Sequence, residues 1–146
     1  MSTIIGFTGT KRGLTNFQRN EIYRLLVELK ATEFHHGDCV GADLIAHKIA
    51  LSLHIPIVVH PPEDSSFRAY SSYIITPLDL VTTLDPDDYI LRNHAIVDAS
   101  DIMLAAPRTN KLEIRSGTWA TIRYDRRFGN VLYMIYPKRT EVKNIK

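Results

Sequence analysis

Short apolar runs alternate along the chain with longer segments whose apolar residues recur every three or four positions. Five runs stand out, at residues 3–9, 32–38, 55–61, 101–107 and 130–137. Most are apolar without interruption, which is typical of strands that are covered on both faces of a parallel sheet. Strands that alternate with amphipathic helices predict an α/β class. We expect a Rossmann-like three-layer fold with a central parallel sheet of about five strands and helices on both faces.

Helix start signals lie between these runs. Thr15 and Gln18 have the spacing of a capping box, so the first helix is expected to begin there. A second helix is expected over residues 41–53, where alanine and isoleucine recur on one face. Asp85, which Pro86 follows, predicts the start of a third helix.

Two further segments follow from glycine and proline placement. The last helix is expected to begin at Ser116 or Gly117 and to end near Gly129, which can adopt the left-handed conformation that closes helices. Residues 60–85 are rich in serine, proline, aspartate and tyrosine, and their periodicity is weak. We therefore expect a long ordered loop or lid there, broken by a short helix.

Composition limits the kinds of protein that this chain can be. Its 146 residues, 45% of them hydrophobic, suit a single domain over residues 1–137, followed by a frayed polar tail over 138–146. A net charge of +2 is too small for a dedicated duplex-DNA binder but allows a local cationic pocket. A single cysteine and the absence of a secretory signal pattern predict a cytoplasmic location. No apolar run reaches the roughly 18 residues that cross a bilayer.

The candidate binding residues lie in loops that follow the predicted strands. Such loops emerge at one edge of an open parallel sheet, so we expect four of them to form a single crevice: FTGTKRGLT, HHGDCVGAD, HPPEDSSFRAY and APRTNKLEIRSGT. We expect ligand-binding residues at Thr8, Gly9, Thr10, Lys11 and Arg12 in the first loop, Gly37, Asp38, Gly41 and Asp43 in the second, Arg92 and Asn93 on the third helix, and Pro107, Arg115, Ser116, Gly117 and Thr118 around the start of the last helix.

The first loop, GTKRG, places two glycines around a threonine and two cations. Backbone N–H groups and the side chains of Lys11 and Arg12 can surround an anion there. The loop matches neither the dinucleotide-binding fingerprint nor a P-loop, and a purely steric role for its glycines is the alternative.

The second loop, HHGDCVGAD, places two glycines around an acidic residue before a helix. Asp38 or Asp43 can accept hydrogen bonds from ribose hydroxyls or a base edge, and helix capping is the alternative for Asp43. A zinc site is disfavoured because no paired spacing supports it, although imidazole and thiolate ligands are present in His35, His36, Cys39 and His47.

The segment RSGTWATIR begins where the last helix is expected to start. Ser116, Gly117 and Thr118 would form its first turn, where unpaired N–H groups and the helix dipole favour an anion, and Arg115 adds a cation. An ordinary serine cap before a packed tryptophan explains the same residues. The convergence of this turn with the other glycine loops favours a phosphate.

Five segments taken in order carry a resemblance over nearly the whole chain: FTGTKRGLT, FHHGDCVGADLIAHKIA, VVHPP, YILRNHAIVDASDIMLAAP and RSGTWATIRYDRRFG. Together they resemble the SLOG superfamily, the Rossmann-like group that includes the LOG phosphoribohydrolases, the DprA proteins and the small YspA/YpsA-like proteins. The YspA/YpsA-like branch is the most similar. The resemblance implies the fold more specifically than it implies an activity.

The LOG signature matches this chain only in part. Arg92 matches the arginine of its helix, with Asn93 in place of lysine, and Gly117 and Thr118 match the glycine and threonine of PGGxGTxxE. Residues 113–116, Glu-Ile-Arg-Ser, stand where PGGx would be, and Thr121 stands at the catalytic glutamate. A threonine cannot act as a carboxylate in N-glycosidic cleavage, so the resemblance implies binding without that catalysis.

The resemblance thus implies a protein that binds a nucleotide-derived ligand, of ADP-ribose-like or cyclic nucleotide character, without a catalytic residue, metal or cofactor. It would act as a sensor, or as a phage protein that sequesters a signal of antiphage defence. One alternative is an N-glycosidase-like enzyme that uses Asp38, Asp43 or Glu113. The other is a single-stranded nucleic-acid binder that uses the Arg/Tyr segment ATIRYDRRFG, which the small net charge makes a minority hypothesis. Relatives of this kind imply a homo-oligomer, a dimer or larger.

Overall fold

A single seven-stranded sheet organises residues 2–74, 80–113 and 116–143, the part of the chain that the computed structural model describes. The strand order is β4-β3-β2-β1-β5-β6-β7, and every neighbouring pair is parallel except β6 with β7. The strands are β1 (Ile4–Gly9), β2 (Glu33–His36), β3 (Ile57–Val59), β4 (Val81–Thr83), β5 (Ile102–Ala106), β6 (Val131–Ile135) and β7 (Thr140–Lys143). The α/β class and the Rossmann-like architecture are therefore confirmed, with two edge strands beyond the expected five.

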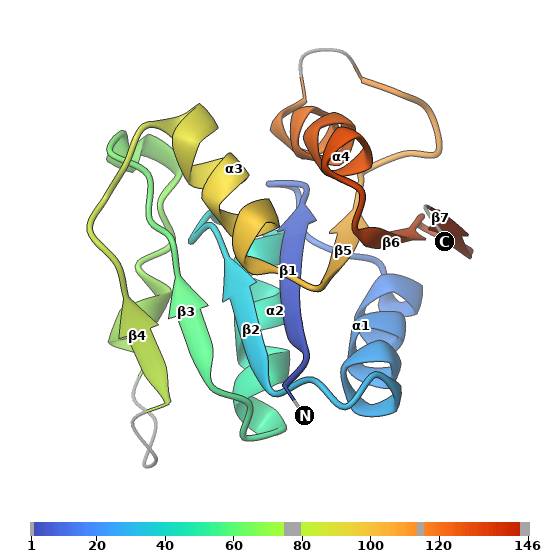
Figure 1. Ribbon diagram of the computed structural model, residues 1–146, viewed down its shortest axis with the longest axis horizontal. Helices are drawn as coiled ribbons and strands as arrows, with labels where there is room; N and C mark the ends of the chain where they lie inside the picture. The colour runs from blue at the N-terminus through green and yellow to red at the C-terminus, as the bar shows by residue number, and fades with distance from the viewer. Residues whose placement is uncertain (1, 75–79, 114–115, 144–146) are drawn as a thin grey trace.

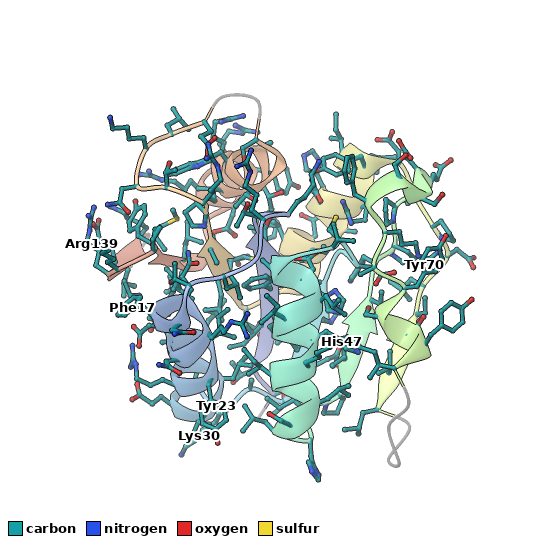
Figure 2. The ribbon with its side chains drawn as sticks, turned by 180° about the vertical axis from the view of Figure 1, so that it is seen from behind. Phe17, Tyr23, Lys30, His47, Tyr70 and Arg139 are labelled. Carbon is teal, nitrogen blue, oxygen red and sulfur yellow. The ribbon has the colours of Figure 1, made fainter. Side chains whose placement is uncertain are left out.

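The four α-helices cover both faces of the sheet (Figures 1 and 2). They are α1 (Asn16–Glu28), α2 (Ala42–Ser52), α3 (Tyr89–Ala99) and α4 (Gly117–Phe128). Helices α1 and α2 pack together on one face, and α3 and α4 pack together on the other. Alternate residues of β5 serve the two cores: Leu104 lies in the core under α1 and α2, and Met103 in the core under α3 and α4.

Chain reversal at β1 determines where a ligand can enter. Strands β1 to β4 are added in one direction, after which the chain crosses back and pairs β5 with the free side of β1. In open α/β sheets the crevice outside the carboxyl ends of the strands at such a switch point is the usual ligand site. The carboxyl ends of the parallel strands point to the top of the view in Figure 1, where α4 begins.

Most predicted helix ends are confirmed. Thr15 caps α1 in a complete capping box with Gln18, and Gly129 closes α4 at φ 101°. The start of α3 was predicted wrongly, because Asp88 and not Asp85 is its cap. Asp87 exchanges backbone hydrogen bonds with the segment after β3, which keeps the preceding residues extended and delays the helix.

Two segments that we expected to be irregular contain strands. Residues 60–85 hold the short 3₁₀ turns η1 (Ser65–Phe67) and η2 (Ser71–Tyr73), and then β4, whose three residues are too few to give a periodic signal. In the expected tail, residues 140–143 pair antiparallel with β6 as β7. Its polar composition suits an edge strand, where charged side chains protect an open edge.

Candidate functional site

A cavity of about 270 Å³ lies at the switch point between β1 and β5. The loops after β1, β2 and β5 line it together with the first two turns of α3 and α4. Its lining residues are Phe7, Thr8, Gly9, Thr10, Lys11, Arg12, Gly37, Cys39, Asp43, Tyr89, Arg92, Asn93, Ile96, Arg108, Glu113, Ser116, Gly117, Thr118 and Thr121. Twelve of the sixteen predicted binding residues are among them.

The first turn of α4 forms one wall of this cavity. Ser116 caps the helix, and its hydroxyl accepts a hydrogen bond from Trp119 N at 3.4 Å. The next N–H groups, of Gly117 and Thr118, have no partner within a helix because no turn precedes them. No acidic residue lies in this turn to balance the positive end of the dipole.

Gly117 also allows a close approach of α3. A Cβ at this position would overlap the hydroxyl of Tyr89, the first residue of α3. The absence of a side chain therefore lets Tyr89 stand against the start of α4, and the two helix N-termini meet at the cavity wall.

Arg92 supplies a buried cation to the same cavity. Its side chain is 2% exposed, and its Nη1 donates hydrogen bonds to the carbonyl oxygens of Gly37 and His60, the latter at 3.3 Å. Its Cζ lies 4.8 Å from the centroid of the Tyr89 ring. Its Nε is buried without a hydrogen-bond partner, and no carboxylate in the described part of the chain forms an ion pair with it.

Gly37 is required by this arrangement, since a Cβ there would overlap the Arg92 guanidinium. The cation is therefore held in place by backbone carbonyl oxygens, which orient it without neutralising its charge. An anion in the cavity would complete its coordination.

Asp43, in the first turn of α2, is the buried carboxylate of the cavity. Its Oδ2 accepts a hydrogen bond from Cys39 N at 3.1 Å, and its Oδ1 is buried without a partner. Burial raises the pKa of Asp43 to about 6, although Arg92 acts in the opposite direction. Burial, and next the nearby Asp43 carboxylate, raise the pKa of the Cys39 thiol to about 11, so this thiol stays protonated.

The remaining charged lining residues lie at the cavity mouth. Arg108 Nη2 forms an ion pair with Glu113 Oε2 at 2.7 Å, so these two charges balance each other. Lys11 Nζ lies 3.9 Å from the centroid of the Phe67 ring. Arg12 is exposed beside it. With Arg108 and Glu113 paired, the described lining keeps three cations against one carboxylate and therefore favours anions.

Asp38 was expected in this site but lies outside the cavity. It is fully buried, its carboxylate accepts hydrogen bonds from the backbone N–H and hydroxyl of Ser71, and it forms an ion pair with Arg68 at 2.9 Å. Its role is therefore to hold the segment after β3 against the loop after β2. That segment, the third expected loop HPPEDSSFRAY, does not line the cavity.

Three other predicted residues are not among those that line the cavity, and two of them make contacts between the segments around it. Gly41 has φ 84°, and a Cβ there would overlap the backbone of Lys11, so glycine lets the loops after β1 and β2 pack directly. The carbonyl oxygen of Pro107 accepts a hydrogen bond from Gln18 Nε2 at 3.0 Å. Arg115 falls outside the described residues.

Seven lining residues were not among the predicted binding residues, and for two of them, Tyr89 and Arg108, the sequence contained a signal. Tyr89 lies three positions before Arg92, a spacing that places both residues on one face of a helix. This spacing is the sequence signal that could have identified Tyr89 as a site residue. Arg108 directly follows the end of the β5 run, where functional side chains of parallel sheets gather.

Four of the six histidines contact one another in pairs. His36 Nε2 lies 2.8 Å from His47 Nδ1, and His35 lies between His60, at 2.7 Å, and Glu33, at 2.5 Å. Figure 2 shows His47 on α2. Within residues 2–74, 80–113 and 116–143, no three histidine, cysteine or acidic side chains are grouped so as to hold a metal ion.

Solved structures resemble this fold at low sequence identity. The molybdenum cofactor binding protein of the phototrophic bacterium Rippkaea orientalis is 18% identical, with a TM-score of 0.64 over 90% of this chain and 75% of that one. DNA processing protein A of Helicobacter pylori, for which a single-stranded DNA binding mode is described, is 18% identical, with a TM-score of 0.63 over 89% and 63% of the two chains. DprA of Streptococcus pneumoniae is 15% identical, with a TM-score of 0.63 over 90% and 49%.

The chain therefore shares the Rossmann-like α/β fold of these structures, which is the fold that the sequence analysis predicts. No protein-family model and no curated protein matches the sequence. Among the helices of the described residues, none is long and apolar enough to cross a membrane.

Proposed function

We propose that the cavity at the β1–β5 switch point binds a nucleotide-derived ligand, of ADP-ribose-like or cyclic nucleotide chemistry, without cleaving it by the LOG reaction. One observation carries this proposal. Two positive groups that lack a protein carboxylate partner, the first turn of α4 and the guanidinium of Arg92, line the same cavity.

A phosphate suits these two groups best. The N–H groups at the start of α4 and the hydroxyl of Thr118, whose side chain is 6% exposed, can donate to its oxygens. A buried cation without a counter-ion costs free energy, and a bound anion recovers that cost. Anion binding is therefore coupled to the stability of the site.

Asp43 provides the complementary polar group. Its buried Oδ1 needs a donor, and a ribose hydroxyl or the N–H of a base can supply one. The pair of an anion cradle and a buried acceptor thus favours a phosphorylated sugar or nucleotide over a bare anion.

Thr121 supports binding without LOG-type catalysis. It stands at the position of the LOG glutamate, and its hydroxyl donates to the carbonyl oxygen of Gly117 at 3.1 Å, within its own helix. A binder of this kind suits a sensor of a nucleotide signal or a phage protein that sequesters one. Solved structures of similar fold include a molybdenum cofactor binding protein and a protein with a single-stranded DNA binding mode, which supports ligand binding as the role of this site.

A specific observation also favours one enzymatic alternative. Of the three candidate carboxylates, Asp38 lies outside the cavity and accepts a hydrogen bond from Ser71, and Glu113 forms an ion pair with Arg108. Asp43 is buried in the cavity with one free oxygen and a raised pKa of about 6, which suits general acid–base chemistry. Release of free base or ribose phosphate that Asp43→Asn abolishes would establish this alternative.

The test is calorimetric titration with ADP-ribose, a set of cyclic nucleotides, AMP, ribose 5-phosphate and a single-stranded oligonucleotide. Thr118→Val removes one hydroxyl at nearly constant volume and should weaken nucleotide binding about 10- to 100-fold, as loss of a hydrogen bond to a charged group does. Thr83→Val, on the exposed edge strand β4, is the matched control and should bind like the wild type.

Two results would contradict the proposal. Either no nucleotide binds at millimolar concentration, or Thr118→Val binds as tightly as Thr83→Val. If only the oligonucleotide binds, and its affinity falls steeply as the salt concentration rises, the ligand of the site is single-stranded nucleic acid and not a free nucleotide.

A further inference from the structure

We propose that Phe67 is the stacking platform for the aromatic base of the ligand. The inference rests on the proposed function and names the chemical class that the site selects: a nucleotide with a planar base, in preference to a sugar phosphate. Phe67 ends the η1 turn in the third expected loop, outside the set of residues that line the cavity.

The ring of Phe67 is exposed and lies against a residue that lines the cavity. Its side chain is 54% exposed, and the ammonium of Lys11, a lining residue, lies 3.9 Å from the ring centroid. Lysine has a long flexible side chain, so it can move aside or turn toward a phosphate when a base approaches. The Phe67 ring then presents an apolar face next to the bound anion.

The backbone holds Phe67 in this place. Its carbonyl oxygen accepts a hydrogen bond from Val40 N at 2.8 Å, and the next residue, Arg68, forms an isolated bridge with Cys39. The buried carboxylate of Asp38 binds Arg68 and thereby fixes the chain beyond the ring. A stacking residue on an otherwise irregular segment is thus anchored to the loop that carries Asp43.

Contacts between residues run continuously from the anion cradle to this ring. The start of α4 lies against Tyr89, whose ring lies under the Arg92 guanidinium. Arg92 reaches the loop after β2, which carries Asp43 at its end. Gly41 of that loop packs on Lys11, and Lys11 covers Phe67.

Donors for a phosphate and an acceptor for a hydroxyl therefore line the cavity, and an apolar ring lies next to it, in contact with Lys11. This is the order of phosphate, sugar and base in a nucleotide. Stacking on an aromatic ring is tolerant of base identity, because every base has a π-face. The geometry predicts a site that requires a base and discriminates weakly among bases.

The experiment compares AMP with ribose 5-phosphate, which differ only by the base. We expect wild-type protein to bind AMP more tightly. Phe67→Ala should weaken AMP binding about 5- to 100-fold and leave ribose 5-phosphate within about twofold. Phe67→Trp, with a larger ring, should retain AMP binding.

Tyr73→Ala is the matched control, because Tyr73 is also an exposed aromatic of this segment, 78% exposed, and stacks on Tyr70 instead of contacting a lining residue. It should leave both affinities unchanged. Figure 2 shows Tyr70 on the same segment, away from α4.

The outcomes separate the two proposals. If neither compound binds the wild type, the proposed function fails and this inference fails with it. If both bind equally tightly, or Phe67→Ala weakens them to the same extent, only the inference is overturned. An effect of Tyr73→Ala as large as that of Phe67→Ala would also overturn it.

Discussion

The N-termini of α2 and α4 both lie at the carboxyl edge of the sheet, and the chain uses them in opposite ways. At α2, Ala42 N donates to the carbonyl oxygen of Thr10 at 2.9 Å, and Asp43 lies in the first turn. At α4, Ser116 provides a side-chain cap, and no acidic residue follows in the first turn. The positive end of one dipole is satisfied by the protein, and that of the other faces the cavity.

Different neighbours account for this difference. The loop after β1 packs directly on the start of α2, because glycine at residue 41 leaves no side chain between them. The start of α4 meets only a tyrosine side chain across Gly117, and the cavity lies beside it. Both helices thus begin at or beside a glycine, but their N-termini have different roles. The start of α2 packs against the loop after β1, and the start of α4 presents N–H donors to the cavity.

The largest expected effect separates the two glycines. Gly41→Ala must place a side chain at φ 84° and against the backbone of Lys11, so it should lower the free energy of unfolding by about 2–6 kcal/mol. Gly117→Ala meets only the tip of a partly exposed tyrosine and gains helix propensity, so its stability should change by about 1 kcal/mol or less.

Urea denaturation of the two variants measures this difference in the free energy of unfolding. Ligand titration then measures the affinity of each variant for a nucleotide. Gly117→Ala displaces Tyr89 in the cavity and should weaken nucleotide binding while the protein stays folded. Equal destabilisation by the two substitutions would mean that the start of α4 is as rigidly packed as that of α2, which would remove the basis of the comparison.

More of the fold than of the site can be predicted from the sequence, because helix caps and strand runs depend on residues that are close together in the chain. The capping box of Thr15 and Gln18 is local, and its pattern is sufficient to place the start of α1. The strand runs follow from periodicity, whereas the switch point follows only from the strand order of the structure. The three-residue β4 and the edge strand β7 lack such a pattern, since pairing with a neighbour stabilises them.

Site chemistry depends on contacts between distant residues. The orientation of Arg92 is determined by carbonyl groups of Gly37 and His60, which belong to other loops. From the sequence, Asp38 and Asp43 are equally good candidates for a hydrogen-bond acceptor of the ligand. In the structure the Ser71 hydroxyl donates to Asp38, whereas Oδ1 of Asp43 has no hydrogen-bond partner. Local sequence placed the glycines and the helix start correctly at the sheet edge, and could not decide which carboxylate faces the cavity.

A smaller, pH-dependent effect tests the carboxylate at the start of α2. Burial raises the pKa of Asp43 from 3.8 to about 6, so the folded state binds this proton more tightly than the unfolded state. Its contribution to stability is therefore present at low pH and is lost as the pH rises through about 6. Asp43→Asn removes this dependence.

We expect the stability of wild type relative to Asp43→Asn to rise by about 1–2 kcal/mol between pH 8 and pH 5, measured by urea denaturation at each pH. Burial lowers the pKa of His47 and His60 to about 4, which destabilises both proteins on acidification. Those contributions cancel in the difference. A difference that stays constant over this range would show that Asp43 is solvated or paired, and would weaken its assignment as an acceptor for the ligand.

The smallest effect concerns the cap of α4 itself. Ser116 Oγ accepts from Trp119 N at 3.4 Å, a long hydrogen bond, so Ser116→Ala should lower the free energy of unfolding by only about 0.5 kcal/mol. Thr15→Ala on α1 removes a hydroxyl that also donates to Pro137 O at 2.9 Å, and should cost about 1–2 kcal/mol. If the start of α4 is kept open for a ligand, a saturating nucleotide should enlarge the effect of Ser116→Ala and leave that of Thr15→Ala unchanged, because only the α4 cap orients donors to the bound anion. An equal shift in both variants would mean that the ligand stabilises the whole fold without engaging the first turn of α4.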